Sequence, residues 1–260
     1  MTSHHPRKRF GQHFLKDSHV LQEMMRCLAL QKNDNVIEIG PGLGALTTYL
    51  TESLDHLNAV ELDRDLITHL QKKFDAKKLT IFSADALDFS YSSLSKKKND
   101  LRIVGNLPYN ISTPLLFKLF LEIDCIHDMH FMLQKEVVLR LTAEIGSADY
   151  GRLSVMSQYF CDNHYLFDVP PDAFDPPPKV DSAIVRLTPK KQILLSNKQF
   201  DIFSTIVKEA FNYRRKKISN SLKRFIDADS LIKINIDPNT RPQDTSLAEF
   251  IRISEMISVE

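Results

Sequence analysis

The segment Val36-Ile-Glu-Ile-Gly-Pro-Gly-Leu-Gly44 joins a short apolar run to a helical pattern that starts at Ala45. Its three glycines, Gly40, Gly42 and Gly44, would allow a tight turn and the close approach of a ligand. The dinucleotide pattern G-x-G-x-x-G and the lysine of a Walker loop are both missing, so a pyrophosphate cofactor is disfavoured. The segment predicts a strand, a turn and a helix, with a ligand at the turn. A tight turn without a ligand would have the same glycines.

Around this turn, short apolar runs alternate with helical patterns. Each run is nearly continuous in Val, Ile, Leu or Phe, which is typical of strands that are covered on both faces. This rhythm predicts an α/β fold with a Rossmann-like parallel sheet, whose ligands bind at the carboxyl ends of the strands. We expect strands at Asn35–Ile39, Leu57–Glu61, Leu79–Ser83, Arg102–Gly105 and Met129–Leu133.

The later part of the chain completes the sheet and then becomes helical. After a helix near Glu136–Ile145, the runs Leu153–Tyr159 and Ala183–Leu187 are expected to pair and close the sheet. From residue 190 onward the pattern is helical with few turn signals. We therefore predict two domains. Residues 1–189 form the sheet domain with a basic N-terminal arm, and residues 190–260 form a small helical domain.

Composition gives weaker constraints. The chain has 260 residues, 34 of them Lys or Arg and 33 Asp or Glu, so net charge does not indicate a polyanionic partner. Cys27, Cys125 and Cys161 are far apart, which disfavours a disulfide framework and a zinc site, and we expect no metal. The first residues, Met1 to Lys16, are polar and basic, and no apolar run reaches membrane-spanning length. We expect a soluble, cytoplasmic protein.

Two acids follow predicted strands. Glu61 ends the second strand, where a carboxylate can accept hydrogen bonds from both hydroxyls of a ribose. Asp85 follows the third strand and could accept a hydrogen bond from an adenine amino group. Alone, each could be a solvated acid at a strand end. Together with the glycine turn, the two acids match the way S-adenosylmethionine lies across such sheets.

The motif Asn106-Leu107-Pro108-Tyr109 directly follows the fourth predicted strand. An aromatic amine is a poor nucleophile because its lone pair is delocalised into the ring, so a catalyst must hold its N–H bonds away from the attacking direction. Asn106 offers a side-chain carbonyl and Leu107 a backbone carbonyl, while Pro108 has no competing N–H. Tyr109 can stack on the base. An ordinary type I turn is the alternative interpretation.

Phe174 lies in the proline-rich segment Asp172-Ala-Phe-Asp-Pro-Pro-Pro-Lys-Val-Asp-Ser182. A stiff loop can hold an aromatic ring as a stacking plate, so Tyr109 and Phe174 could sandwich an adenine that has been flipped out of its stack. Burial of Phe174 in the core is equally compatible with the sequence.

Basic residues gather between Val207 and Arg224, where seven cations accompany one acid. At 100° per residue, one helix through this segment would put apolar residues on one stripe and cations on the opposite face. That basic face predicts contact with RNA phosphates, although a solvated face is the usual meaning of such a run. The expected stripe is Phe211, Ile218, Leu222 and Phe225, and the expected cations are Lys216, Lys217, Lys223 and Arg224, with a second cluster at Arg7, Lys8 and Arg9.

Several segments together resemble the ribosomal RNA adenine dimethyltransferase family, in particular its bacterial small-subunit branch. The resemblance covers about Arg7 to Leu187. His13 stands where many members have Asn. The segments that carry the resemblance are Arg7–Leu15, Glu38–Gly44, Asn106–Thr113, Tyr150–Val155 and Phe174–Ser182.

The resemblance implies roles for individual residues. Contacts to S-adenosylmethionine are implied for His13, Leu15, Gly40, Glu61, Asp85 and Asn106. Handling of the target base is implied for Asn106, Leu107, Tyr109 and Phe174.

The resemblance also implies a substrate, which composition and spacing do not reveal. Two adjacent adenosines in the terminal hairpin of small-subunit rRNA would each be dimethylated within a precursor ribosomal particle, by an enzyme that we expect to be a monomer. Three other functions stay open: a DNA adenine-amine methyltransferase, a large-subunit rRNA methyltransferase, and an assembly checkpoint factor whose catalytic pocket is secondary.

Overall fold

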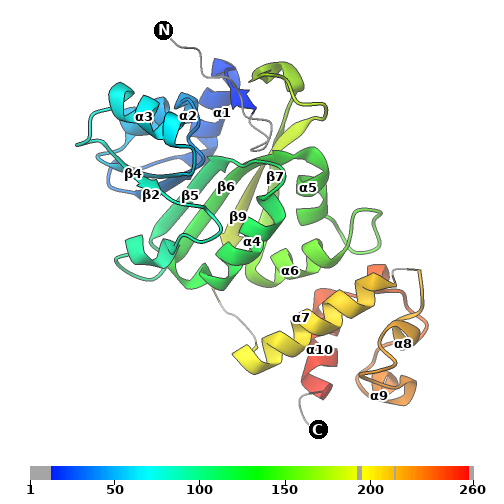
Figure 1. Ribbon diagram of the computed structural model, residues 1–260. Helices are drawn as coiled ribbons and strands as arrows, with labels where there is room; N and C mark the ends of the chain where they lie inside the picture. Colours follow the sequence, from blue (N-terminus) through cyan, green and yellow to red (C-terminus); the bar gives the residue numbers. More distant parts are fainter. Residues whose placement is uncertain (1–12, 192–194, 214, 258–260) are drawn as a thin grey trace. The chain divides into compact units, whose positions relative to one another are not determined.

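The computed structural model describes residues 13–191, 195–213 and 215–257, and the chain forms two compact units (Figure 1). The sheet unit consists of the chain up to Val138 and His164–Pro189, and the helical unit consists of Leu139–Asn163 and the chain from Lys190 onward. The expected boundary after Pro189 is therefore one of the points where the chain passes between units. Residues 139–163, which we expected in the first domain, group with the helical unit instead.

A seven-stranded sheet with the order β4-β3-β2-β5-β6-β9-β7 forms the centre of the sheet unit. Its first five strands are parallel, and β9 runs antiparallel to β6. The five strands expected before residue 134 are all present, three of them with the expected bounds. The strands are β1 (Phe14–Leu15), β2 (Asn35–Ile39), β3 (Leu57–Glu61), β4 (Leu79–Ser83), β5 (Leu101–Asn106), β6 (Ile126–Gln134), β7 (Cys161–Val169), β8 (Phe174–Asp175) and β9 (Ser182–Pro189).

Helices cover both faces of this sheet. Val36, Val104 and Met132 pack in one core cluster with side chains from the first two helices. Ile37, Ile103 and Phe131 point to the other face and are also fully buried. Figure 1 shows α4 in front of the sheet. The helices are α1 (Ser18–Leu28), α2 (Ala45–Ser53), α3 (Arg64–Lys73), α4 (Ser112–Leu121), α5 (Lys135–Leu141), α6 (Arg152–Phe160), α7 (Asn197–Asn212), α8 (Ile218–Ser221), α9 (Ala228–Lys233) and α10 (Leu247–Ile257).

The strand expected at Leu153–Tyr159 is wrong, because these residues belong to helix α6. A continuous apolar run fits a buried helix as well as a buried strand. The helix gives the buried Ser154 hydroxyl two hydrogen-bond partners. It accepts from the Gly151 N–H and donates to the Arg140 carbonyl. The outer strand of the sheet is instead β7, and the strand expected at Ala183–Leu187 lies within β9.

Strands β2 and β5 approach each other so closely at Gly105 that a side chain would not fit. A Cβ atom on Gly105 would lie 2.5 Å from the Ile39 carbonyl oxygen, far inside van der Waals contact. The close approach brings the end of β2, which leads into the glycine turn, beside the end of β5, which leads into Asn106.

In the helical unit, α7 and α10 pack against each other and against α6. Aromatic rings fill the spaces, with Tyr159 against Phe203 and Phe211 against Phe250. No helix within the described ranges is both long and apolar enough to cross a bilayer.

The single helix expected through Val207–Arg224 is wrong. Helix α7 ends at Asn212, Tyr213 leaves helical geometry, and a four-residue helix, α8, begins at Ile218. Long-range backbone hydrogen bonds replace the helix, since the Ile218 N–H donates to the Thr240 carbonyl at 2.6 Å. Like charges also disfavour a helix here, because Arg214 and Lys217 would be neighbours at the i,i+3 spacing.

Candidate functional site

The glycine turn after β2 adopts a backbone that only glycine tolerates well. Gly40, Gly42 and Gly44 have φ values of 67°, 59° and 79°. A Cβ on Gly42 would press on the Phe14 ring and one on Gly44 on the Phe74 ring, at 3.1 and 2.8 Å. The nearest atom to a Cβ on Gly40 would be the Asn106 carbonyl oxygen, at 3.9 Å. Gly40 is thus the glycine whose backbone borders open space.

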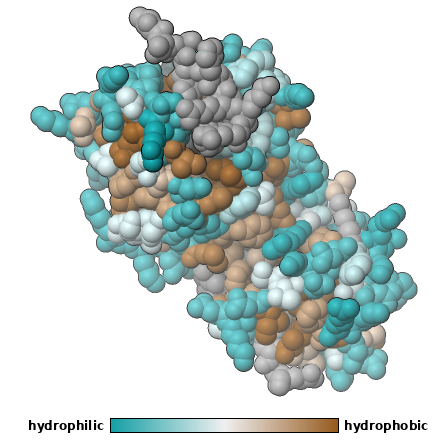
Figure 2. Space-filling view, in the orientation of Figure 1, coloured by the Kyte–Doolittle hydropathy of each residue, from teal (hydrophilic) through white to brown (hydrophobic). Residues whose placement is uncertain are grey.

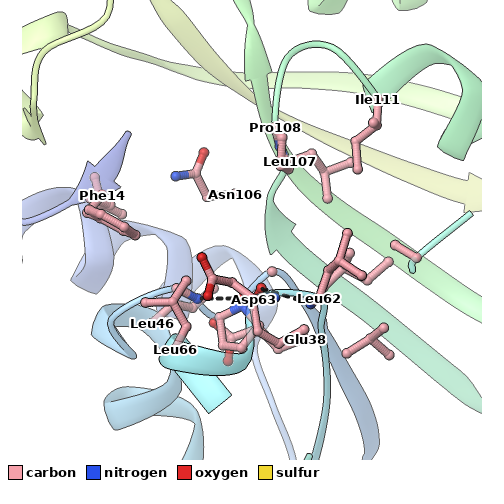
Figure 3. Close-up of a pocket in the computed structure, with 18 of the residues that line it drawn as sticks. Phe14, Glu38, Leu46, Leu62, Asp63, Leu66, Asn106, Leu107, Pro108 and Ile111 are labelled. Carbon is pink, nitrogen blue, oxygen red and sulfur yellow. Dashed lines mark hydrogen bonds between the residues drawn. The ribbon is translucent and has the colours of Figure 1, made fainter. Parts of the chain in front are cut away.

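A pocket of about 170 Å³ opens at this turn, at the carboxyl ends of the parallel strands. Figure 3 shows the Asn106 amide projecting into the space between Phe14 and the Leu107–Pro108 turn, with Glu38 and Asp63 across from it. In the space-filling view, apolar side chains gather in patches on the visible face of the sheet unit, among hydrophilic ones (Figure 2). The site residues expected from the sequence that line the pocket are His13, Leu15, Gly40, Glu61, Asp85, Asn106, Leu107 and Tyr109.

Carboxyl groups dominate the charge of this pocket. Glu38, Glu61, Asp63 and Asp85 line it, and its described lining contains no lysine or arginine. A pyrophosphate would meet four acids and no cation. A nucleoside with positive charge would be attracted to the same wall.

Glu61 is fixed by the backbone around it. Its Oε1 accepts from the Leu62 and Asp63 N–H groups at 2.9 Å, and its Oε2 accepts a longer bond of 3.3 Å from the Gly42 N–H. Burial raises the pKa of Glu61, and the three backbone donors oppose that shift. Oε2 accepts a single hydrogen bond from the described residues, so it keeps acceptor capacity.

Glu38 also lies in the wall, and sequence reasoning assigned it no role. Its side chain is 2% exposed and accepts a 2.7 Å hydrogen bond from the Thr47 hydroxyl. Burial raises its pKa to about 8, and the Glu61 charge adds to that effect while Lys73 opposes it. The sequence did contain a signal for a role of Glu38, namely an acid inside an apolar strand. A buried carboxyl group needs either a partner or a function.

The Asn106 side chain has a defined orientation. Its Nδ2 donates to the His13 backbone carbonyl at 3.0 Å, so the amide nitrogen is occupied. Its Oδ1 accepts no hydrogen bond from the described part of the chain. Next to it, Leu107 anchors the turn through its N–H, which donates to the Met132 carbonyl at 3.1 Å.

Tyr109 is held at its hydroxyl and across its ring. The phenol lies 2.7 Å from the Ser182 hydroxyl, and the His13 ring stacks on the Tyr109 ring with centroids 5.8 Å apart. His13 Nδ1 lies 2.8 Å from the Pro176 carbonyl oxygen, to which it donates. Burial raises the pKa of Tyr109, so the phenol stays protonated at neutral pH.

Phe174 stands apart from these residues. It pairs with Leu15 between β8 and β1, is 1% exposed and belongs to the core cluster beneath the pocket. The structure therefore does not bring its ring to the pocket wall, and stacking on a base would require β8 to separate from β1.

The four cations expected to face RNA are all exposed in the helical unit. Their surroundings differ from the expected stripe, because Ile226 is buried while Phe225 is 38% exposed. Lys217 Nζ donates to the Asn239 side-chain oxygen at 2.7 Å, and Lys216 Nζ lies 4.4 Å from the Tyr213 ring centroid. The second cluster, Arg7 to Arg9, lies outside the described residues.

A separate charged cluster lies at the amino ends of the same strands. Arg102, near the start of β5, donates two bonds to Asp128 at 2.9 and 2.7 Å and one to Asp34 at 2.8 Å. It also donates to the Leu28 carbonyl at the end of α1. The two carboxylates raise the pKa of Arg102 against the opposing effect of burial. Sequence reasoning did not identify this cluster.

Comparison with known proteins gives consistent relatives. The profile of the family described as Ribosomal RNA adenine dimethylase matches residues 3–258. A Coxiella burnetii protein named Ribosomal RNA small subunit methyltransferase A is 56% identical over 97% of this chain and 98% of its own length. A Legionella pneumophila protein of the same name is 49% identical over 98% of this chain and 99% of its own length.

Solved structures share the fold. A dimethyladenosine transferase from Plasmodium falciparum superposes with a TM-score of 0.79 at 25% identity, over 93% of this chain and 96% of the other. The 23S rRNA methyltransferase ErmE gives a TM-score of 0.74 at 23% identity, over 94% of this chain and 99% of the other.

Proposed function

Because the chain belongs to the ribosomal RNA adenine dimethylase family, we propose that it dimethylates the exocyclic amines of two adjacent adenosines in the 3′-terminal hairpin of small-subunit rRNA. The methyl donor is S-adenosylmethionine. The substrate is a precursor small-subunit particle, on which the enzyme acts as a cytoplasmic monomer.

The pocket fits the methyl donor by charge and by the position of its acceptors. S-adenosylmethionine carries a sulfonium and an ammonium, which suit a wall of carboxyl groups. When bound, it supplies an electrophilic methyl group. Glu61 would hold the ribose hydroxyls and Asp85 the adenine amine, while Gly40 would admit the ligand close to the backbone. His13 and Leu15 would complete the wall on the β1 side.

The observation that carries the proposed chemistry is the orientation of the Asn106 amide. Since its nitrogen donates to the His13 carbonyl, its oxygen is the group left to accept an N–H from the target amine. The Leu107 carbonyl would accept the other N–H. Holding both N–H bonds in this way turns the nitrogen lone pair toward the methyl donor, so catalysis depends mainly on positioning. No strong base is needed, because the methylated ammonium is acidic enough for water to take its proton.

Tyr109 is the ring that we assign to the flipped base, since it borders the pocket next to Asn106. Stacking on an aromatic ring contributes about 1–3 kcal/mol per base. Phe174 remains a candidate for the opposite face of the base, and this role would require its ring to be uncovered.

The deciding experiment is incubation with labelled S-adenosylmethionine and unmethylated small subunits, followed by nucleoside mass spectrometry. We expect dimethyladenosine at two adjacent positions, and no label on subunits that are already methylated. Label on naked large-subunit RNA or on DNA, with none on small subunits, would reject the proposed substrate. The names of the relatives favour the small subunit over these rivals.

The RNA contact is proposed for the basic surface, defined as Lys216, Lys217, Lys223 and Arg224. All four are exposed, and none forms an ion pair with any described residue. Cations without nearby acids release counterions from RNA when they bind phosphates. The surface lies outside the pocket residues, so binding and catalysis should be separable.

Charge reversal of these four residues should weaken particle binding and flatten its salt dependence. Affinity measured from low to high salt provides the test. Lys198→Glu is the matched control for Lys216→Glu, because Lys198 is an exposed cation in the first turn of α7, whereas Lys216 follows the end of that helix at Asn212. Equal affinity and salt dependence for the fourfold variant and the wild type would reject the assignment.

A further inference from the structure

The hydrogen bond between Tyr109 and Ser182 joins two parts of the chain that are 73 residues apart. Tyr109 follows the carboxyl end of β5. Ser182 begins β9, where it pairs with Gln134 at the end of β6. Because β9 is antiparallel to β6, the first residue of β9 lies beside the carboxyl ends of β5 and β6. The topology thus brings a buried serine beside the ring that borders the pocket.

Ser182 has few alternatives to this bond. The residue is fully buried, and within the described part of the chain its hydroxyl bonds to Tyr109 alone. If the Tyr109 ring swung outward, its own phenol could bond to water, but the serine hydroxyl would be left without a partner. A buried polar group without a partner is costly, so the bond opposes outward rotation of the ring.

The backbone on the serine side is itself fixed. Beside it, the Lys135 N–H donates to the Asp181 carbonyl at 3.0 Å, which holds the end of the proline-rich segment against the start of α5. Within the same segment, the Pro176 carbonyl accepts from His13, whose ring stacks on Tyr109. The proline-rich segment therefore contacts two pocket residues, Tyr109 through Ser182 and His13 through Pro176, while its own aromatic residue, Phe174, lies in the core.

We propose that Ser182 is a positioning residue for the target base, acting by holding the Tyr109 ring in its stacking orientation before RNA arrives. A ring that is already ordered loses less side-chain entropy when a base stacks on it. This inference rests on the proposed function, because the orientation of Tyr109 matters for the reaction only if its ring meets the target base.

The test compares Ser182→Ala, Tyr109→Phe and the double variant on unmethylated small subunits. Each single variant removes the same hydrogen bond and keeps the aromatic ring. We expect each to raise KM for the subunit by about two- to tenfold, the usual net contribution of one hydrogen bond, with cofactor affinity unchanged. The double variant should be no worse than either single variant, because both remove one interaction.

Two further measurements separate positioning from general damage to the fold. Ser254→Ala is the matched control, since Ser254 is a fully buried serine in α10 of the helical unit, and it should leave KM unchanged. The fluorescence of 2-aminopurine at the target position reports stacking, and Ser182→Ala should reduce the stacking signal.

The outcomes distinguish this inference from the function on which it rests. Wild-type protein that forms no dimethyladenosine would reject the proposed function itself. Wild-type methylation together with an unchanged KM and stacking signal in Ser182→Ala would overturn only the role of Ser182. The role of Ser182 would also be overturned if the two substitutions had additive effects on KM. The same holds if Ser182→Ala lowered cofactor affinity as much as it raised KM for the subunit.

Discussion

The two ends of strand β5 hold charge in opposite ways. At the amino end, Arg102 is surrounded by Asp128, Asp34 and a backbone carbonyl, so each buried charge has an ionic partner. At the carboxyl end, Glu38 and Glu61 are at least as buried as Arg102, but within the described part of the chain their hydrogen bonds come only from the Thr47 hydroxyl and from backbone N–H groups. This difference supports the carboxyl end as the candidate ligand site. A positively charged ligand would neutralise the carboxyl groups at the carboxyl end, whereas the charges at the amino end already neutralise one another.

The largest effect is expected from removing Arg102, the cation at the amino end of β5. Arg102→Met should destabilise the protein by about 3–5 kcal/mol, because it leaves two partly buried carboxylates without their counter-ion. Urea unfolding measures the change. The matched control is Arg26→Met, which removes an exposed ion pair with Glu23 and should cost under about 1 kcal/mol. Methylation per folded molecule should stay at the wild-type level in both variants, and a specific loss in Arg102→Met would contradict the division between the two ends.

At the pocket end, Asn106→Ala should leave stability nearly unchanged and lower kcat/KM by about 10²–10³-fold, as expected when one preorganised polar group is removed from a reaction centre. Methylation kinetics on small subunits provide the measurement. Asn106→Asp is the informative companion, because it keeps an acceptor oxygen but points a carboxylate at the His13 carbonyl that now receives a hydrogen bond. Wild-type rates in Asn106→Ala would reject the amine-orienting role, while retained particle binding would separate catalysis from RNA contact.

The smallest effect is a pH dependence from Glu38. Its pKa is about 8 in the folded protein and near 4.5 without burial, so folding takes up a proton between these values. Stability should therefore fall as pH rises from about 4.5 to 8, and Glu38→Gln should lack that part of the fall. We expect a difference of about 1–3 kcal/mol across this window.

Urea unfolding at several pH values tests this expectation, with Glu52→Gln, which removes an exposed carboxyl from α2, as the control. Parallel stability curves for wild type and Glu38→Gln would show that the buried carboxyl is not protonated on folding. A positive ligand in the pocket should shift the balance toward the ionised form, so cofactor affinity should rise with pH in the wild type more than in Glu38→Gln.

Local signals in the sequence predicted the pocket well. The strands at 35–39, 57–61 and 79–83 and the turn between Gly40 and Gly44 depend on neighbouring residues, and the structure has them where expected. Because parallel strands end at one edge of a sheet, strand bounds alone bring Gly40, Asp85 and Asn106 to one cavity.

Features set by distant residues could not be predicted. The strand expected at Leu153–Tyr159 is a helix because buried hydroxyls bond to carbonyls, and the helix expected through Lys216 breaks because the backbone near Ile218 bonds to Thr240. The contacts of Tyr109 with Ser182 and His13 likewise join segments that no local pattern relates. The sequence allowed both burial and base stacking for Phe174, and only the pairing of β8 with β1, which no local pattern announces, buries its ring in the structure.

Gly105 has a consequence for how the enzyme could be altered. Where β2 and β5 lie side by side at Gly105, main chain faces main chain, and there is no room for a larger side chain. Engineering that aims at a larger substrate would have to widen the mouth through loops such as 106–111. The contact of β2 with β5 at Gly105 would stay as it is, because it lies within the sheet.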